Sequence, residues 1–128
     1  ATAANLPEVT IWGTGTPRRE FLYVEDMAAG CLHVMNLDDA TLQREFLSYP
    51  KPCFVNLGTG EDISIADLAA LIARTTGFKG RIVFDHSKPD GTPRKLLDVS
   101  RMHSYGWRAK IAMVDGILKT ADYFRQFK

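Results

Sequence analysis

The sequence has little of what marks a membrane protein, a metalloprotein or a strongly basic protein. Its 128 residues contain only two cysteines, and the formal net charge is +1. No apolar run approaches the roughly 20 residues needed to span a bilayer. The near-zero net charge argues against a surface built to neutralise a nucleic-acid backbone. With 45% hydrophobic and 24% charged residues, the composition predicts an ordinary globular chain, organised as a single domain over residues 1–128.

Cysteine and histidine spacing gives no metal-binding pattern. Cys31 and Cys53 form neither a Cys-x-x-Cys motif nor a Cys/His pair at ligand spacing, so they are predicted to be free, half-buried thiols in a reducing cytoplasm. The histidines, His33, His86 and His103, lack acidic or thiol partners at ligand spacing. The opening "ATAANLPEVT" has no initiating Met, basic start or apolar core. It predicts no secretory signal and suggests a piece of a longer protein.

Three short apolar runs predict strands, and three periodic segments predict helices. The strands are expected at residues 8–12, 53–57 and 81–85, each followed by turn residues. One helix is expected to begin at Asp26 as its N-cap, one to run over residues 65–76, and one to continue from residue 114. Ser64 and Asp67 resemble a capping box for the second helix. Strands that alternate with helices favour an α/β layer arrangement.

The chain shows no machinery of its own for binding a dinucleotide or transferring a hydride. The dinucleotide fingerprint needs a third glycine, but from Gly13 and Gly58 the third position holds Arg18 and Ile63. Both Gly-Thr-Gly triplets are therefore predicted to be turns. A Tyr-x-x-x-Lys pair is also missing, because none of the four tyrosines has Lys four residues later.

Two cationic turns remain as a candidate site. "TPRREF" and "SKPDGTPRK" each follow a predicted strand end, which is where ligands bind in α/β sheets. The arginine fork of Arg19 can hold two phosphate oxygens, Lys88 adds a point charge, and Asp90 suits a ribose hydroxyl pair. Trp12 could lie against a base. Together they favour recognition of a nucleoside diphosphate. The alternative is that these are solvated loop charges, with Trp12 packed in the core.

These segments resemble a known family. "WGTGTPRREFLYVEDMAAGCLHVM", "FVNLGTGEDISIADLA" and "GRIVFDHSKPDGTPRKLLDVSRM" are similar to successive blocks in the C-terminal part of the GDP-L-fucose synthase family, a group of extended short-chain dehydrogenase/reductases. The similarity covers nearly the whole chain, and "KPDGTPRKLLDV" is its most specific block. Related sugar-nucleotide epimerases and dehydratases share the patterns near "REFLYV" and "NLGTG". The implied fold is the α/β substrate-binding portion of such an enzyme.

The resemblance implies a function and assigns residues to it. It implies 3,5-epimerisation of GDP-4-keto-6-deoxy-D-mannose and then NADPH-dependent reduction to GDP-L-fucose. By this analogy Arg19 contacts the diphosphate, Lys88 lies near it, Asp90 holds ribose or guanosine hydroxyls, and Trp12 lines the pocket. The family carries its NADP turn and its catalytic residues in an N-terminal Rossmann half, which this chain lacks. The chain is therefore expected to be inactive alone, and the complete enzyme to be a cytoplasmic homodimer.

The missing half has a consequence for folding, and other functions stay open. The helix after Asp26 and the strand at 53–57 would lack neighbours, so an exposed apolar surface and self-association are expected. Another NDP-sugar epimerase or dehydratase would share the fold and the diphosphate contacts. A basic nucleic-acid module, suggested by Arg18-Arg19 and Arg94-Lys95, conflicts with the net charge. A scaffold domain without a ligand is the third alternative.

Overall fold

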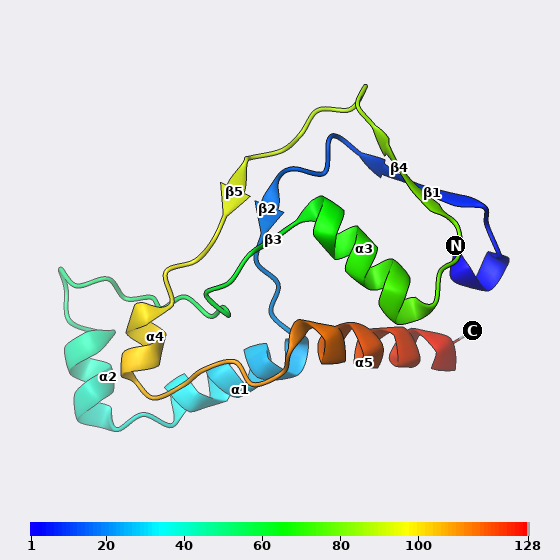
Figure 1. Ribbon diagram of the computed structural model, residues 1–128. Coiled ribbons are helices and arrows are strands. Elements are labelled where there is room, and N and C mark those ends of the chain that lie inside the picture. The colour runs from blue at the N-terminus through cyan, green and yellow to red at the C-terminus, as the bar shows by residue number, and fades with distance from the viewer. Residues whose placement is uncertain (128) are drawn as a thin grey trace. The chain divides into compact units, whose positions relative to one another are not determined.

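The computed structural model in Figure 1 describes residues 1–127, which form two compact units. The first unit combines Ala1–Glu20, Asp62–Leu96 and the chain from Ala112 onward, and the second combines Phe21–Glu61 with Leu97–Ile111. The elements of the first unit are η1 (Thr2–Ala4), β1 (Glu8–Trp12), β2 (Arg18–Arg19), β3 (Ile63–Ser64), α3 (Ile65–Thr76), β4 (Arg81–Asp85), β5 (Arg94–Lys95) and α5 (Met113–Gln126). The second unit contains α1 (Val24–Met35), α2 (Asp39–Glu45) and α4 (Ser100–Ser104).

Two of the three predicted strands pair with each other. β1 and β4 run parallel, in a register that sets Glu8 opposite Arg81 and Trp12 opposite Asp85. The ladder continues one step further, because the Gly13 amide donates to the Asp85 carbonyl at 3.0 Å. Parallel strands end at the same edge of a sheet. The turn after β1 and the loop after β4 therefore begin side by side.

A second, smaller sheet in the same unit has the strand order β3-β2-β5. β2 pairs antiparallel with β3 and parallel with β5. Each of these strands is only two residues long, so backbone hydrogen bonds alone hold the sheet weakly. Side chains must therefore help to fix its register.

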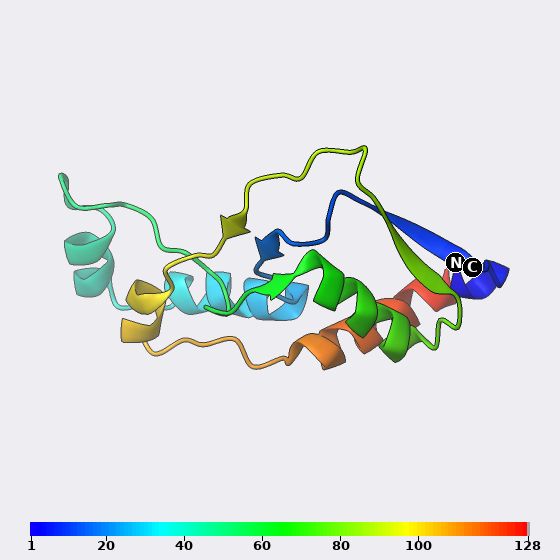
Figure 2. The same ribbon diagram turned by 45° about the horizontal axis from the view of Figure 1, so that its top comes forward.

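Helix α3 begins and ends as its sequence predicts. The Ser64 hydroxyl oxygen accepts a hydrogen bond from the Asp67 amide at 3.0 Å, and the same hydroxyl donates to the Asp67 carboxylate at 2.6 Å. Gly77 ends the helix with φ 73°, a left-handed conformation that favours glycine. Figures 1 and 2 both show α3 running beside α5, which also follows the predicted segment.

In the second unit, α1 begins earlier than predicted. Its N-cap is Tyr23, so the prediction of Asp26 as the cap is wrong. Asp26 lies inside the first turn, is only 5% exposed, and accepts hydrogen bonds from the amides of Lys110 (2.9 Å) and Ile111 (2.8 Å). The carboxylate therefore ties the helix to a distant segment. The core of this unit is formed by Phe46, Val99, Met102 and Trp107.

Residues 53–57 do not form the predicted strand. Side chains make hydrogen bonds here instead: the Arg101 guanidinium donates to the Phe54 backbone carbonyl, and the Asn56 side-chain amide donates to the Asp98 backbone carbonyl at 3.0 Å. A strand needs a neighbouring strand for its backbone groups, and no strand of the described chain pairs with this segment. Phe54 is accordingly 64% exposed. Within residues 1–127, no helix is both long and apolar enough to cross a membrane.

Candidate nucleoside diphosphate site

The turn after β1 and the loop after β4 are joined by a carboxylate. Asp90 accepts two hydrogen bonds from Thr14, one from the backbone amide at 2.9 Å and one from the hydroxyl at 2.6 Å. The Thr14 hydroxyl also lies 2.7 Å from that of Thr16. Gly13 has φ 82°, and a Cβ built on it would lie 2.2 Å from the Asp90 carboxylate. The close approach of the two segments therefore requires glycine at position 13.

Trp12 and Lys88 meet at the same edge. The Lys88 ammonium lies 5.8 Å from the centre of the Trp12 ring, within the range of a cation–π interaction. Trp12 is 73% exposed. The part of the alternative that packs this ring in the core is therefore wrong, and the indole is accessible to a ligand.

Arg19 lies against the same loop. One of its terminal nitrogens donates to the Arg18 carbonyl at 2.6 Å. The other terminal nitrogen would lie 3.1 Å from a Cβ built on Gly91, so the guanidinium sits directly beside the loop backbone. The structure thus places Trp12 and Arg19 against the loop that carries Lys88 and Asp90.

The charges at this edge are mixed. Arg19 and Lys88 supply two cations, and Asp90 supplies one anion. Hydrogen bonds from the Thr14 hydroxyl and amide, with a smaller contribution from His86, hold the pKa of Asp90 below its ordinary value. Asp90 is therefore ionised at neutral pH and, with several lone pairs, can accept further hydrogen bonds from ligand hydroxyls. Such an arrangement can bind an anion and read a neighbouring hydroxyl.

Sequence reasoning missed Thr14, which holds Asp90 in place. The Thr14 hydroxyl and amide, in a Thr-rich turn, both donate to the Asp90 carboxylate, but Thr14 and Asp90 are 76 positions apart in the sequence. Arg94, by contrast, takes no part in this edge, because its guanidinium pairs with Asp62.

Both cysteines, His33 and His103 belong to the second unit, whereas His86 lies in the loop after β4, beside Asp90. Both cysteines are free and exposed, so the prediction that they are half-buried is wrong. A ring nitrogen of His33 lies 2.6 Å from the Tyr105 carbonyl, within the second unit. Among residues 1–127, no group of three or more His, Cys, Asp or Glu side chains could hold a metal ion.

Residues 1–48 match the NAD dependent epimerase/dehydratase family. The GDP-L-fucose synthase of Escherichia coli (strain K12) is 51% identical over 124 residues, which are 97% of this chain and 38% of that protein. A Campylobacter jejuni GDP-6-OMe-4-keto-L-xylo-heptose reductase superposes with a TM-score of 0.84 and 38% identity, covering 94% of this chain and 34% of that one. A GDP-L-fucose synthetase from Naegleria fowleri, bound to NADP, gives a TM-score of 0.76 and 25% identity, with 93% and 35% covered.

These matches confirm the fold class that the sequence predicts. The chain has an α/β fold that matches part of the extended short-chain dehydrogenase/reductase enzymes. Within that class, it resembles GDP-L-fucose synthase, as expected from its sequence blocks. The chain spans only about a third of the length of the relatives it matches.

Proposed function

We propose that this chain is the GDP-sugar binding portion of a GDP-L-fucose synthase, and that it is inactive alone. The complete enzyme would convert GDP-4-keto-6-deoxy-D-mannose to GDP-L-fucose by 3,5-epimerisation and NADPH-dependent 4-reduction. The observation that carries the proposal is that Trp12 and Arg19 both lie against the loop after β4, which carries Lys88 and Asp90: Trp12 contacts Lys88, and Arg19 lies beside Gly91. The similarity to GDP-sugar enzymes supports the same substrate class.

Each residue of the site has a role that follows from its chemistry. Arg19 would grip the diphosphate through its planar fork, with Lys88 adding a mobile positive charge beside it. Asp90 would accept hydrogen bonds from ribose or guanosine hydroxyls. The exposed Trp12 ring would stack on a flat, apolar part of the ligand.

The cofactor of the complete enzyme would be NADP, which supplies the hydride for the reduction when bound. The residues of this chain do not fit it. The Gly13 turn lacks a third glycine, and its open side is filled by the Asp90 carboxylate, which would repel a pyrophosphate. NADP would therefore be held by residues of a Rossmann half outside this chain, where the catalytic Tyr-x-x-x-Lys would also lie.

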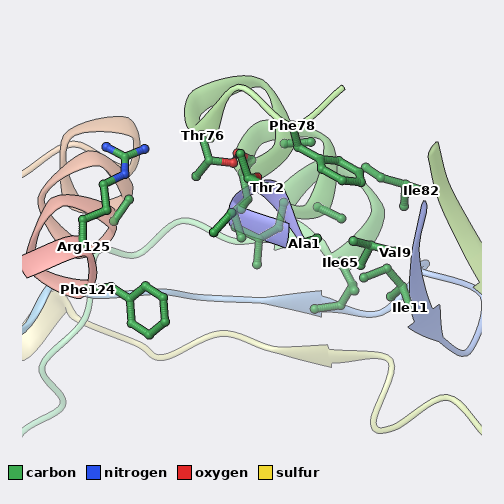
Figure 3. Close-up of a pocket in the computed structure, with 16 residues that line it drawn as sticks. Ala1, Thr2, Val9, Ile11, Ile65, Thr76, Phe78, Ile82, Phe124 and Arg125 are labelled. Atoms are coloured by element: carbon green, nitrogen blue, oxygen red, sulfur yellow. The ribbon is translucent and has the colours of Figure 1, made fainter. Parts of the chain in front are cut away.

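An apolar cavity in the first unit supports the proposal that this chain packs against the rest of a larger enzyme. It measures about 520 Å³ and is lined by residues of β1, α3, β4 and α5, together with Phe78 and residues 1–3. Figure 3 shows Phe124 and Arg125 on one side of it and Val9, Ile11 and Ile82 on another. The cavity is open to solvent, and monomeric proteins rarely leave a large apolar surface exposed to water. Side chains from the remaining two thirds of the enzyme would fill such a space.

Exposed apolar side chains on α1 support the same conclusion for the second unit. Val24, Met27 and Leu32 are 67%, 47% and 58% exposed. A monomeric protein rarely leaves such side chains together in water. We propose that the Rossmann half covers this face, and that the complete enzyme is a homodimer. A cytoplasmic location stays a prediction from the sequence.

The proposal is tested by a chimera. In the Escherichia coli enzyme, the matching 124 residues are replaced by this chain, and NADPH oxidation is followed with the GDP-4-keto sugar. The chimera should turn over, the same chimera with Arg19→Ala should lose most activity at low substrate, and the isolated chain should show none. A folded, NADPH-binding chimera without activity, or turnover by the isolated chain, would contradict the proposal.

Nucleotide preference separates this function from that of another NDP-sugar epimerase or dehydratase. GDP, UDP and dTDP share the diphosphate and differ in the base, so calorimetric titration with all three reports base selection directly. A clear preference for GDP supports the proposal, and a preference for UDP or dTDP supports the alternative. A nucleic-acid module is disfavoured further, because Arg18 and Arg94 are already paired with Asp62.

A further inference from the structure

Asp62 binds two arginines at once. It lies just before β3, and its side chain is only 4% exposed. One carboxylate oxygen accepts from Nε of Arg18 at 2.7 Å, and the other accepts from Nε of Arg94. The Asp62 backbone carbonyl also accepts from a terminal nitrogen of Arg18 at 2.9 Å. A single carboxylate therefore links all three strands of the small sheet.

The two arginines need such a partner because they face each other. Arg18 and Arg94 are directly opposite in the parallel pairing of β2 with β5. Like charges opposite each other on neighbouring strands are destabilising. The strands are two residues long, and the Arg18 amide adds one further bond, to the Pro93 carbonyl at 2.8 Å. With so few backbone bonds, charge balance by Asp62 decides whether β2 and β5 stay paired.

This sheet also positions two parts of the candidate site, Arg19 on β2 and the loop that leads into β5. Side chains alternate between faces along a strand, so Arg19 points away from the face on which Arg18 meets Asp62. β5 begins at Arg94, immediately after the loop that carries Lys88, Asp90 and Gly91. A shift of β2 against β5 would therefore move Arg19 relative to that loop.

We propose that Asp62 is a positioning residue of the diphosphate site, which keeps Arg19 against the loop after β4 (residues 86–93) by offsetting the repulsion between Arg18 and Arg94. It acts without touching the ligand. The identity of the ligand rests on the proposed function, whereas the positioning role of Asp62 rests on the geometry alone. Hydrogen bonds from Arg94 and then Arg18 hold the pKa of Asp62 below its ordinary value, so the carboxylate is charged throughout the neutral range.

The test is a set of four variants titrated with GDP. Asp62→Asn keeps the shape but removes the charge, and should weaken GDP binding about tenfold, as expected for a misplaced charge-assisted contact. Adding Arg94→Gln to Asp62→Asn removes the repulsion and should restore affinity to within about threefold of the wild type. Arg94→Gln alone should have little effect, because Arg18 keeps its partner. Glu61→Gln, a neighbouring exposed carboxylate, is the control and should change nothing.

A merely structural role would give a different pattern. If each substitution only weakened the fold, the losses of the double variant would add instead of cancelling. Unchanged affinity in Asp62→Asn, or no recovery in the double variant, would overturn the inference. If Asp62→Asn does not fold, a folded double variant supports the charge balance, and an unfolded one overturns it.

A second measurement keeps the inference independent of the ligand. Hydrogen exchange of the Arg18 amide reports the pairing of β2 with β5 directly. Exchange should be faster in Asp62→Asn and return toward the wild-type rate in the double variant. If the wild-type chain does not bind GDP, the proposed function of the site fails, while the exchange rates still decide the positioning. Equal exchange in the wild type and Asp62→Asn would overturn it.

Discussion

Replacing Gly13 by alanine should disrupt the contact between the turn after β1 and the loop after β4. Gly13 has φ 82°, and a Cβ there would lie 2.2 Å from the Asp90 carboxylate. Because that distance is far below van der Waals contact, Asp90 must move. Its two hydrogen bonds with Thr14 would then be lost or lengthened.

The size of the effect follows from two contributions. A left-handed backbone costs an L-residue roughly 1–2 kcal/mol. Displacing Asp90 also loses or lengthens its two hydrogen bonds with Thr14, and this loss adds to the backbone cost. Gly13→Ala should therefore lower the free energy of unfolding by more than the roughly 1–2 kcal/mol of the backbone contribution alone. Gly77, with φ 73° and open space around its missing Cβ, carries the backbone contribution alone.

Urea unfolding followed by circular dichroism compares the two variants. Gly77→Ala should cost about 1–2 kcal/mol, and Gly13→Ala should cost clearly more. In Gly13→Ala, NMR should show the Thr14 amide losing protection from exchange. If Gly13→Ala costs no more than Gly77→Ala and leaves the Thr14 amide protected, the close contact of Gly13 and Thr14 with Asp90 is contradicted.

Three further predictions concern acidity, thiols and association. Because hydrogen bonds lower the pKa of Asp62 and Asp90 in the folded chain, both stabilise it above their unfolded pKa of about 3.9. Stability measured by urea titration should be lost as the pH falls through the lowered values, and Asp62→Asn should flatten this acid limb; an unchanged limb would contradict the assignment. Both Cys31 and Cys53 should react with a thiol reagent in the folded chain, and a protected thiol would refute their exposure. The isolated chain should self-associate in sedimentation experiments, and Leu32→Lys on the exposed face of α1 should reduce this; a monodisperse wild-type monomer would count against it.

The elements that sequence predicts well are those defined by local chemistry. α3 has a serine cap, a regular apolar spacing and a terminal glycine, all within 14 residues. β1 and β4 are β-branched and apolar, and each is closed by turn residues. The two-residue strands β2, β3 and β5 have no such signal, because two residues show no periodicity. Asp62 connects them through hydrogen bonds from Arg18 and Arg94, which are 44 and 32 positions away in the sequence.

Two of the wrong predictions, those for residues 53–57 and for Asp26, have a common cause in long-range contacts. Residues 53–57 have a good local strand pattern, yet no strand of the described chain pairs with them. Asp26 has the chemistry of an N-cap, but the amides of Lys110 and Ile111 use its carboxylate instead. Local propensity is overridden where a required tertiary partner is missing, as for residues 53–57, or where a distant group competes for the side chain, as for Asp26.

The candidate site was accessible to sequence reasoning because parallel strands end at one edge. That rule places the turn after Trp12 and the loop around Lys88 together without any knowledge of side-chain contacts. The means of joining them was not accessible. Thr14 and Asp90 are ordinary turn residues in the sequence, and only their contact across 76 positions shows that each fixes the other.

Calorimetric titration of the chain with GDP tests the central claim most directly. The wild type should bind, and Arg19→Ala should bind at least about tenfold more weakly, since a bidentate charge-assisted contact is lost. Arg74→Ala removes an exposed arginine from the last turn of α3 and should leave the affinity unchanged. Equal affinities for the wild type and Arg19→Ala, or no binding by the wild type, would contradict the account.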